Sequence, residues 1–326
     1  MEDTEGIKIE RDYRLLDPEE TPQESQQVTE PTVNILRPQR FSDYPGQEKA
    51  KENLQTYVQA SLRRSKEMDH VILHGPPGLG KTTLAHIVAS ELGAPFCCAS
   101  GPSIDKPGDL AGILAGLSPG SLIFIDEIHR LSIQVEEVLY SAMEDFTMEV
   151  IVGQGATARS VSIPIQPFTL VGATTRLSSL SRPFLNRFGI QERLEYYSEE
   201  ALCQIIDRSA KILSISIDPY ATKALARRSR GTPRISNRLL KRVWDFAEVK
   251  GKTEIDCSLV DYALKRLDID HQGLDHIDQS ILRVIEEQYG GGPVGIETLA
   301  VTIGEERTTL EEVYEPYLIH SGFMGR

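Results

Sequence analysis

The chain has 326 residues, of which 48 are Asp or Glu and 35 are Lys or Arg, so its formal net charge is −13. A chain of this length forms about two to three domains and can bury a hydrophobic core without disulfides or structural metals. The excess of acidic residues argues against binding nucleic acid through diffuse positive charge, although a few placed arginines could still hold DNA.

The negative charge is concentrated at the two ends of the chain. Residues 1–30 and residues 271–326 each carry a net charge of −7, whereas residues 31–270 carry +1. The first 33 residues are also polar and rich in Pro, Gln and Thr. Such a segment cannot bury enough apolar surface to offset the entropy of ordering, so we predict a disordered acidic tail over 1–33.

The cysteines and the apolar runs indicate the compartment. The four cysteines form no C-x-x-C pair, and Cys97 and Cys98 are adjacent, so they cannot easily bridge each other. No apolar run approaches the ~20 residues that span a bilayer, and the first residues lack the charged-then-apolar pattern of a signal peptide. We therefore predict a cytoplasmic protein with free thiols and no membrane contact.

Residues 34–197 alternate short apolar runs with stretches of helical periodicity. In the first helix, Leu54, Val58 and Leu62 recur on one face. Strands that alternate with helices favour an α/β domain whose parallel sheet is covered on both faces. The predicted elements are helices over 47–65, 83–92 and 133–146, and buried strands over 70–73, 121–126 and 168–172.

One insertion and two helical regions complete the chain. Residues 148–165 carry β-branched residues on both sides of Gly153-Gln154-Gly155, a pattern typical of a β-hairpin. From Ser198 the chain is helical, and Ser198, Asp218 and Asp256 are expected to cap helices. The expected helices cover 198–213, 218–229, 235–250 and 257–267 in one small domain, and 275–289, 296–303 and 308–320 in the next.

A phosphate loop follows the first strand. Residues 75–82 read GPPGLGKT, which matches G-x-x-x-x-G-K-[ST] between a predicted strand and a predicted helix. Glycines let backbone N–H groups surround phosphate oxygens, and the helix N-terminus adds its dipole. We expect Lys81 to reach the β- and γ-phosphates and Thr82 to ligate Mg²⁺. The alternative is a Gly-Pro turn that carries a lysine, and the flanking elements make it the weaker interpretation.

Polar residues end the second and third strands. Asp126 could complete the Mg²⁺ shell and Glu127 could polarise the attacking water. Taken alone, a strand that ends in Asp-Glu is as often structural, and its position downstream of a phosphate loop favours catalysis. Thr174 ends the strand over 168–172 and could contact the γ-phosphate, although by spacing alone a helix cap is the preferred interpretation.

Two arginines are candidates for charge stabilisation. Arg187 lies in a loop after the third strand, where it could act as an arginine finger or be an ordinary surface residue. The run 227–242 holds seven basic residues and no acidic ones. Within it, Thr232 is expected to cap a helix with Pro233 in the first turn, which would place Arg234 near a nucleotide. The rest of the run fits a solvated basic face.

Taken together, the motifs resemble the RuvB family of the AAA+ superfamily. The segments that carry the resemblance are GPPGLGKTTL, LIFIDEIHR, PFTLVGATTR, RFGI, GTPRISNRLLKRVWD and EEVYEPYLIHSGF, and it extends from about Leu36 to Arg326. It implies an AAA+ P-loop domain over 34–197, a small all-helical lid over 198–270 and a C-terminal winged-helix DNA-binding head over 271–326. It also implies a homo-hexameric ATPase ring that drives branch migration of Holliday junctions in recombination and repair, with a RuvA tetramer and the RuvC nuclease.

The resemblance implies roles for individual residues. ATP, with ADP as product, would bind with Mg²⁺ between the domain and the lid. Catalysis would rest on Lys81, Asp126, Glu127, a first sensor at Thr174 or Thr175, and the finger Arg187, which enters the neighbouring subunit's site. The residues that would bind nucleotide are Leu36, Arg37, Gly78, Gly80, Lys81, Thr82, Thr83, Glu144, Asp145, Phe146, Arg187, Tyr197 and the second sensor Arg234. Arg307 and Arg326 would bind DNA, and the hairpin 148–165 would contact RuvA.

The chain departs from the family pattern in two places. Leu185-Asn186 stands where the family has a second arginine before the finger. The family also carries further basic residues after the segment that ends at Arg326, and their absence would lower DNA affinity.

Two other functional classes fit the sequence less well. A clamp loader would have a collar after the lid, and a protease-associated unfoldase would have an aromatic pore loop. A non-catalytic ATP switch would have no use for Glu127.

Overall fold

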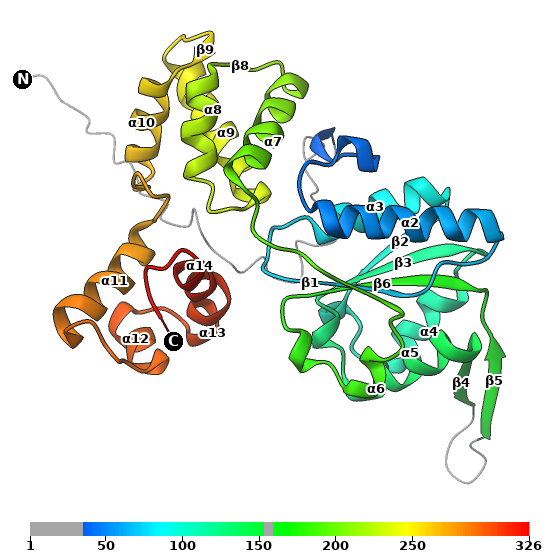
Figure 1. Ribbon diagram of the computed structural model, residues 1–326. Coiled ribbons are helices and arrows are strands. Elements are labelled where there is room, and N and C mark those ends of the chain that lie inside the picture. Colours follow the sequence, from blue (N-terminus) through cyan, green and yellow to red (C-terminus); the bar gives the residue numbers. More distant parts are fainter. Residues whose placement is uncertain (1–34, 153–158, 326) are drawn as a thin grey trace, which may run out of the picture.

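The computed structural model describes residues 35–152 and 159–325, which form an α/β domain, a helical lid and a helical head (Figure 1). The predicted tail over 1–33, the hairpin turn at 153–155 and Arg326 lie outside the described residues.

A five-stranded parallel sheet is the centre of the α/β domain, with the strand order β2-β3-β6-β1-β7. The three predicted strands are confirmed, and they occupy the three middle positions. The two outer strands were not predicted, because β7 alternates buried and exposed residues and β2 is only partly buried. The strands are β1 (Val71–His74), β2 (Phe96–Ser100), β3 (Ser121–Asp126), β6 (Phe168–Thr174) and β7 (Ile190–Arg193).

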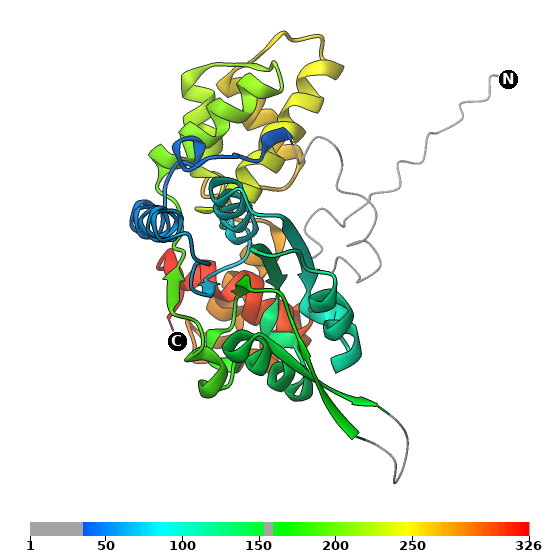
Figure 2. The same ribbon diagram turned by 90° about the vertical axis from the view of Figure 1, so that its right-hand side faces the viewer.

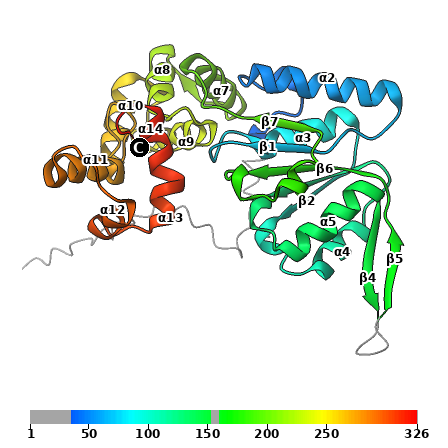
Figure 3. The ribbon, with the colours of Figure 1, turned by 60° about the horizontal axis from the view of Figure 1, so that its bottom comes forward.

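Helices cover both faces of this sheet, as the alternating pattern predicted. On one face lie α2 (Glu48–Arg64) and α3 (Lys81–Leu92), and on the other lie α4 (Pro107–Ala115), α5 (Ile133–Asp145) and α6 (Arg182–Leu185) (Figure 3). Short 3-10 turns occupy Phe41–Asp43, Gly101–Ser103, Ile128–Arg130 and Leu177–Ser179.

The apolar face of α2 differs in one residue from the prediction. Leu54 and Val58 are buried, but Leu62 is 52% exposed and Ser61 is buried instead. Each step of four residues turns about 40° further around a helix, so the third member of the series has rotated off the buried face.

The predicted hairpin is present as β4 (Thr147–Val152) and β5 (Arg159–Pro164), which pair antiparallel. It projects away from the sheet and its helices (Figure 2). Val161 and Ile163 are exposed on it, so the hairpin carries apolar side chains that the described part of the chain leaves accessible.

The lid consists of four helices and shares a core with the α/β domain. Ser198, Asp218 and Asp256 accept backbone N–H bonds at the helix starts, which confirms the predicted caps. Leu225 and Leu240 of the lid belong to the same buried apolar cluster as residues of α2 and α3. The lid elements are α7 (Glu199–Ile212), β8 (Ser216–Ile217), α8 (Pro219–Arg227), α9 (Pro233–Val249), β9 (Glu254–Ile255) and α10 (Cys257–Arg266).

The head has a small apolar core of its own, which includes Ile281, Leu299, Leu310 and Leu318. Its described elements are α11 (His276–Tyr289), α12 (Ile296–Ile303), α13 (Arg307–Thr309), a π-helical turn (Leu310–Tyr314) and α14 (Glu315–His320).

Among the described residues, no helix is long and apolar enough to cross a membrane. The four cysteines are free, as predicted.

Candidate nucleotide-binding site

The ends of three neighbouring strands bring together all of the predicted catalytic residues except Arg187. β6 lies between β1 and β3, and all three run parallel, so their carboxyl ends meet at one edge of the sheet. The phosphate loop follows β1, Asp126 is the last residue of β3 and Thr174 is the last residue of β6. Ligands bind beyond the carboxyl ends of strands in open parallel sheets.

The phosphate loop is packed so closely that two of its glycines are required. Gly78 and Gly80 have φ of 75° and 96°, in the left-handed region. A Cβ on Gly78 would lie 2.7 Å from the methyl carbon of Thr232, and one on Gly80 would lie 2.6 Å from the hydroxyl of Tyr44. The loop is therefore held between the lid and the segment that precedes α2.

Lys81 begins α3 and is largely buried. Its Nζ donates to the carbonyl oxygens of Gly75 at 2.8 Å and Pro76 at 2.9 Å. Burial lowers the pKa of Lys81 to about 8, and the charge of Arg234 acts in the same direction while Asp126 and Glu127 oppose it. Bound phosphate would supply the negative charge that this buried ammonium group lacks.

Asp126 and Glu127 differ in their contacts and burial. Oδ1 of Asp126 accepts from the backbone N–H of Glu127 at 2.9 Å, and burial raises the pKa of Asp126. Glu127 has a left-handed φ of 48°, and its carboxylate pairs with Arg130 at 3.0 Å. The break in strand geometry after Asp126 thus separates the two carboxylates.

The donor chemistry fits Mg²⁺. The Thr82 hydroxyl and the Asp126 carboxylate are hard oxygen donors, and Mg²⁺ in phosphate sites uses one or two such groups together with phosphates and water. Among the described residues, no group of three or more His, Cys, Asp or Glu could hold a metal by itself.

Thr174 and Thr175 differ in exposure. Thr174 is fully buried, and its hydroxyl oxygen lies 3.0 Å from Nδ1 of His129 and accepts from the N–H of Arg176 at 2.9 Å. Thr175 is exposed just beyond the strand end. The contact of His129 with the strand end was not predicted from the sequence.

Tyr197, one of the residues expected to bind nucleotide, is hydrogen-bonded to a second tyrosine. The hydroxyl of Tyr197 is 2.7 Å from that of Tyr44 and 3.1 Å from the carbonyl oxygen of Leu79 in the phosphate loop. Burial raises the pKa of Tyr197 to about 12, so the hydroxyl remains a donor. The carbonyl of Leu36 accepts from Arg208 of the lid at 2.6 Å, while Arg37 is partly exposed. Tyr44 was not predicted, because a single aromatic residue in a short loop has no distinctive pattern.

The lid meets the phosphate loop through the start of α9. Arg234 is the second residue of this helix, and its backbone N–H donates to the carbonyl of Gly78 at 3.4 Å. Thr232 occupies the predicted cap position, but the prediction of its side-chain role is wrong. Its hydroxyl donates to the carbonyl of Arg230 at 3.1 Å and makes no cap bond.

Three family profiles together match almost all of residues 36–326. They are the Holliday junction DNA helicase RuvB P-loop domain over 36–194, the RuvB AAA lid domain over 197–270 and the RuvB C-terminal winged helix domain over 271–326. The chain belongs to the RuvB family. RuvB proteins are AAA+ ATPase motors of Holliday junction branch migration, and the phosphate loop described above lies in the part of the chain that matches the P-loop domain.

Individual RuvB relatives show the same extent of similarity. The Holliday junction branch migration complex subunit RuvB of Lactobacillus johnsonii is 53% identical over 303 residues, which are 93% of this chain and 89% of the relative. The subunit of Bdellovibrio bacteriovorus is 55% identical over 293 residues, 90% of this chain and 89% of the relative. The structure of the Thermotoga maritima RuvB Holliday junction branch migration motor has 48% identity and a TM-score of 0.82, and the match covers 90% of this chain and 93% of that one.

The segment 144–146 does not lie with the phosphate loop. Phe146 follows α5, and its ring packs against Phe168 at 5.9 Å between centroids. Phe168 is the first residue of β6, whereas Thr174 is the last, and a strand of seven residues spans about 20 Å. Glu144, Asp145 and Phe146 therefore belong to the opposite edge of the sheet and could not contact a nucleotide bound by Lys81 of the same chain.

Arg187 lies at this opposite edge as well. It precedes β7, whose first residue, Ile190, donates its N–H to the carbonyl of His70 just before β1 at 3.2 Å. The guanidinium of Arg187 pairs with Glu144 at 2.6 Å, bonds the hydroxyl of Tyr140 and lies 4.3 Å from the centre of that ring. The predicted finger is thus held by α5 of its own chain, away from its own phosphate loop.

Arg307 of the head is exposed and paired. Its guanidinium contacts Glu297 at 2.7 Å and Glu311 at 3.0 Å. A DNA phosphate would have to compete with these two carboxylates, which reduces the affinity that this arginine can supply.

Proposed function

We propose that the chain assembles into a homo-hexameric ring in which each ATP, bound between the α/β domain and lid of one subunit, is hydrolysed with Arg187 of the next subunit. The observation that carries this proposal is the location of Arg187 at the sheet edge opposite to the phosphate loop. Head-to-tail contacts that close into a ring place opposite edges of neighbouring subunits side by side. Glu144, Asp145 and Phe146 would then face the neighbouring nucleotide together with the finger.

Within one subunit, the nucleotide would contact both the domain and the lid. Lys81 would exchange the carbonyls of Gly75 and Pro76 for phosphate oxygens, and Arg234 would approach from the lid. The other proposed contacts are the backbone of Gly78 and Gly80, the side chains of Thr82 and Thr83, and Leu36, Arg37 and Tyr197 around the base and ribose.

Hydrolysis would depend on positioning and charge stabilisation. Glu127 would leave its exposed pair with Arg130 and orient the attacking water. The exposed Thr175 fits the first-sensor role, because the hydroxyl of Thr174 is already bonded. Mg²⁺, held by Thr82 and Asp126 and the phosphates, would neutralise the charge that develops on the phosphate oxygens.

The remaining parts would bind macromolecules. The head, with Arg307 and Arg326, would contact the duplex arms of the junction, and the exposed apolar residues of the hairpin would contact a RuvA tetramer. RuvC would cut the junction later. Free thiols favour a cytoplasmic location. In this proposal, residues 34–197 form the ATPase domain, residues 198–270 the lid and residues 271–326 the DNA-binding head.

Junction unwinding tests this function. The purified chain, mixed with RuvA, ATP and a labelled four-way junction, should separate the junction into two duplexes on a gel. Glu127→Gln should retain ATP binding and lose turnover, because only the water-orienting group is removed. Full turnover by this variant, or a junction left intact by the unsubstituted chain with RuvA, would contradict the proposal.

Mixed rings test the finger separately. Arg187→Ala and Asp126→Asn subunits should each be inactive alone. In a mixed ring, an intact site forms wherever an Asp126→Asn subunit offers Arg187 to an Arg187→Ala subunit, so part of the ATPase activity should return. Co-purification of differently tagged subunits confirms that mixed rings form, and confirmed mixed rings without any activity would refute the finger in trans.

A further inference from the structure

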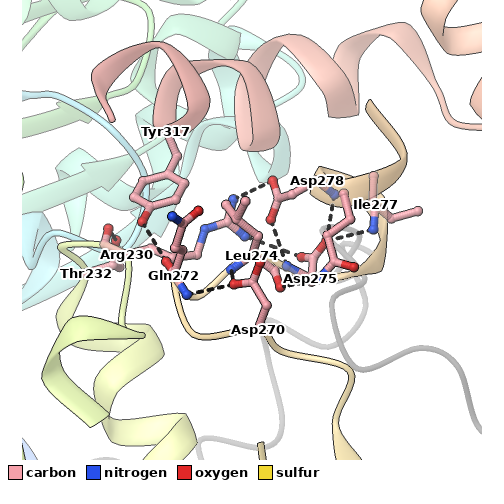
Figure 4. A network of polar contacts seen from close by, with 10 residues as sticks. Arg230, Thr232, Asp270, Gln272, Leu274, Asp275, Ile277, Asp278 and Tyr317 are labelled. Atoms are coloured by element: carbon pink, nitrogen blue, oxygen red, sulfur yellow. Dashed lines mark hydrogen bonds and ion pairs between the residues drawn. The ribbon is translucent and has the colours of Figure 1, made fainter. Parts of the chain in front are cut away.

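Arg230 joins the lid to the head through two buried carboxylates. It lies in the lid loop before α9, and its guanidinium donates to Asp278 at 2.9 Å and to Asp275 at 3.3 Å (Figure 4). The side chains of the three residues are 8%, 0% and 4% exposed, respectively. Asp275 caps α11 of the head and Asp278 is its third residue, and the two close a capping box.

Aromatic and backbone contacts fix the geometry of this cluster. The ring of Tyr317 in α14 lies 4.5 Å from the guanidinium carbon of Arg230, and its hydroxyl donates to the carbonyl of Gln272 at 3.4 Å. Arg230 also has a left-handed φ of 53°. A non-glycine residue in this region and a buried pair of carboxylates with one guanidinium both cost free energy. Buried ion clusters are poor sources of stability, and their attested role is to fix one arrangement among several.

The same loop leads directly to the nucleotide site. The carbonyl of Arg230 accepts from Thr232, whose methyl group packs on Gly78, and Arg234 bonds the carbonyl of Gly78. The carbonyl of Gly231 accepts from the N–H of Tyr197 at 2.9 Å. Only residues 231–233 therefore separate Arg230, which pairs with the head's carboxylates, from Arg234 at the phosphate loop.

A second contact joins the head to the end of β6. Glu312 of the head pairs with Arg176, whose N–H bonds the hydroxyl of Thr174. The head therefore touches both segments from which sensor residues approach the nucleotide. Of the two contacts, only the one through Arg230 is buried, since both side chains of the Arg176–Glu312 pair are 40% exposed.

We propose that Arg230 is a positioning residue that couples the orientation of the head to the position of Arg234 at the phosphate loop, so that DNA bound by the head changes the rate of ATP turnover. This rests on the proposed roles of the head in DNA binding and of Arg234 in nucleotide binding. Arg230 touches neither ligand, and it acts through the loop 231–234.

Asp278→Asn is the principal test variant. It leaves one guanidinium with one carboxylate, which removes the excess buried charge, and the amide oxygen can still accept the cap bond from Asp275. The oxygen cannot serve Arg230 as well, so the contact to the head is weakened while the helix start is kept. Arg230→Lys is the second variant, because it keeps the charge and loses the fork that reaches both carboxylates. Arg242→Ala is the matched control, since it breaks an exposed pair with Asp245 on the same lid helix.

The measurements are the kcat and KM for ATP of the full chain with and without duplex DNA, and the duplex affinity by fluorescence anisotropy. In Asp278→Asn and Arg230→Lys, we expect basal kcat, KM and duplex affinity within about twofold of the original chain. The stimulation of kcat by DNA should fall at least about fivefold, the lower range of measured coupling between sites. The double variant should lose no more stimulation than the single ones, because both break one contact.

Each possible outcome either supports or overturns the proposed coupling through Arg230. Unchanged stimulation in folded Asp278→Asn overturns the proposal, even if Arg230→Lys fails to fold. The proposal is also overturned if the control Arg242→Ala loses the stimulation of kcat by DNA, because the loss would then be a general effect of substitutions in the lid. If the unsubstituted chain hydrolyses ATP without any response to DNA, the proposed DNA-driven ATPase fails together with this coupling. If DNA stimulates ATP turnover by the unsubstituted chain and by the control, but not by Asp278→Asn and Arg230→Lys, the DNA-driven ATPase and the coupling through Arg230 are both supported.

Discussion

The lid and the head are joined to the rest of the molecule in different ways. The lid shares one apolar cluster with α2, α3 and one face of the sheet, in which Leu225 and Leu240 are fully buried. The head has a separate core, and its contacts with the other parts include the Arg230 cluster, the Arg176–Glu312 pair, the contact of Arg228 with His271 and rings around Tyr196. We call the shared cluster of domain and lid the apolar joint, and the contacts of the head the polar joint. A close-packed apolar interface resists sliding, whereas charged contacts fix one orientation but can be exchanged for other charged partners.

This difference fits the positions of the two ligands. The proposed nucleotide site lies across the apolar joint, so we expect the domain and lid to behave as one body around ATP. The head, which we propose binds DNA, lies across the polar joint, so we expect it to change orientation when the charges that hold it are displaced. The predictions below test this contrast.

The largest effect is expected in the apolar joint. Leu240→Ala should lower the free energy of unfolding by about 3 kcal/mol, because it leaves a cavity in a fully buried cluster. Urea denaturation measures the change. Val249→Ala, on the same helix but at an 89% exposed position, should change stability by less than about 0.5 kcal/mol. Equal losses in the two variants would show that the lid is not held by this core.

Bound nucleotide should stabilise the α/β domain and the lid but not the head. A slowly hydrolysed ATP analogue at about 100 times its Kd should stabilise the domain and lid by about 2.7 kcal/mol against thermal unfolding. Hydrogen exchange in α11 and α12 of the head should change much less. Lys81→Ala should abolish the protection, and protection that spreads equally into the head would contradict the separation of the two bodies.

The affinity for nucleotide should fall as pH rises. The pKa of Lys81 is lowered to about 8, so its side chain is a charged ammonium group below pH 8 and loses this charge above pH 8. The charged form binds phosphate, and affinity should therefore drop about tenfold between pH 7 and pH 9. Titration calorimetry at both values measures it. Lys81→Arg stays charged and should flatten the profile, and a steep fall in this variant would assign the effect to another group.

The smallest effect is expected at the exposed part of the polar joint. Arg176→Gln should change the free energy of unfolding by less than about 1 kcal/mol, because exposed ion pairs are screened by solvent and salt. It should nonetheless make the linker around residue 270 more sensitive to limited proteolysis at low salt. Sensitivity equal to that of the original chain at every salt concentration would mean that this pair does not hold the head.

The sequence predicted what local patterns specify. The phosphate loop, the three central strands and the capped lid helices follow from spacing and side-chain chemistry, and the comparisons confirmed the resemblance that the motifs carry. The outer strand β7 escaped prediction because Ile190, Gln191, Glu192 and Arg193 alternate like a surface segment. The bond between His129 and Thr174 and the packing of Tyr44 under Gly80 depend on tertiary contacts that no local pattern encodes.

The Arg230 cluster is the clearest example of this limit. In the sequence, Arg230 is one of seven basic residues in 227–242, and its partners Asp275 and Asp278 are more than 40 positions away. The basic run fits a solvated face until the fold shows which of its members is buried. The placement of Arg187 opposite to the phosphate loop likewise depends on the order of the strands.

Native-state hydrogen exchange tests the contrast between the two joints most directly. Amides of β6 and of the lid helix α9 should open with one common free energy as urea is raised, because they share a core. Amides of α11 and α12 should open at a distinctly lower free energy, since the head can detach without disturbing that core. Separate opening of α9 and β6, or opening of the head together with β6, would contradict the account.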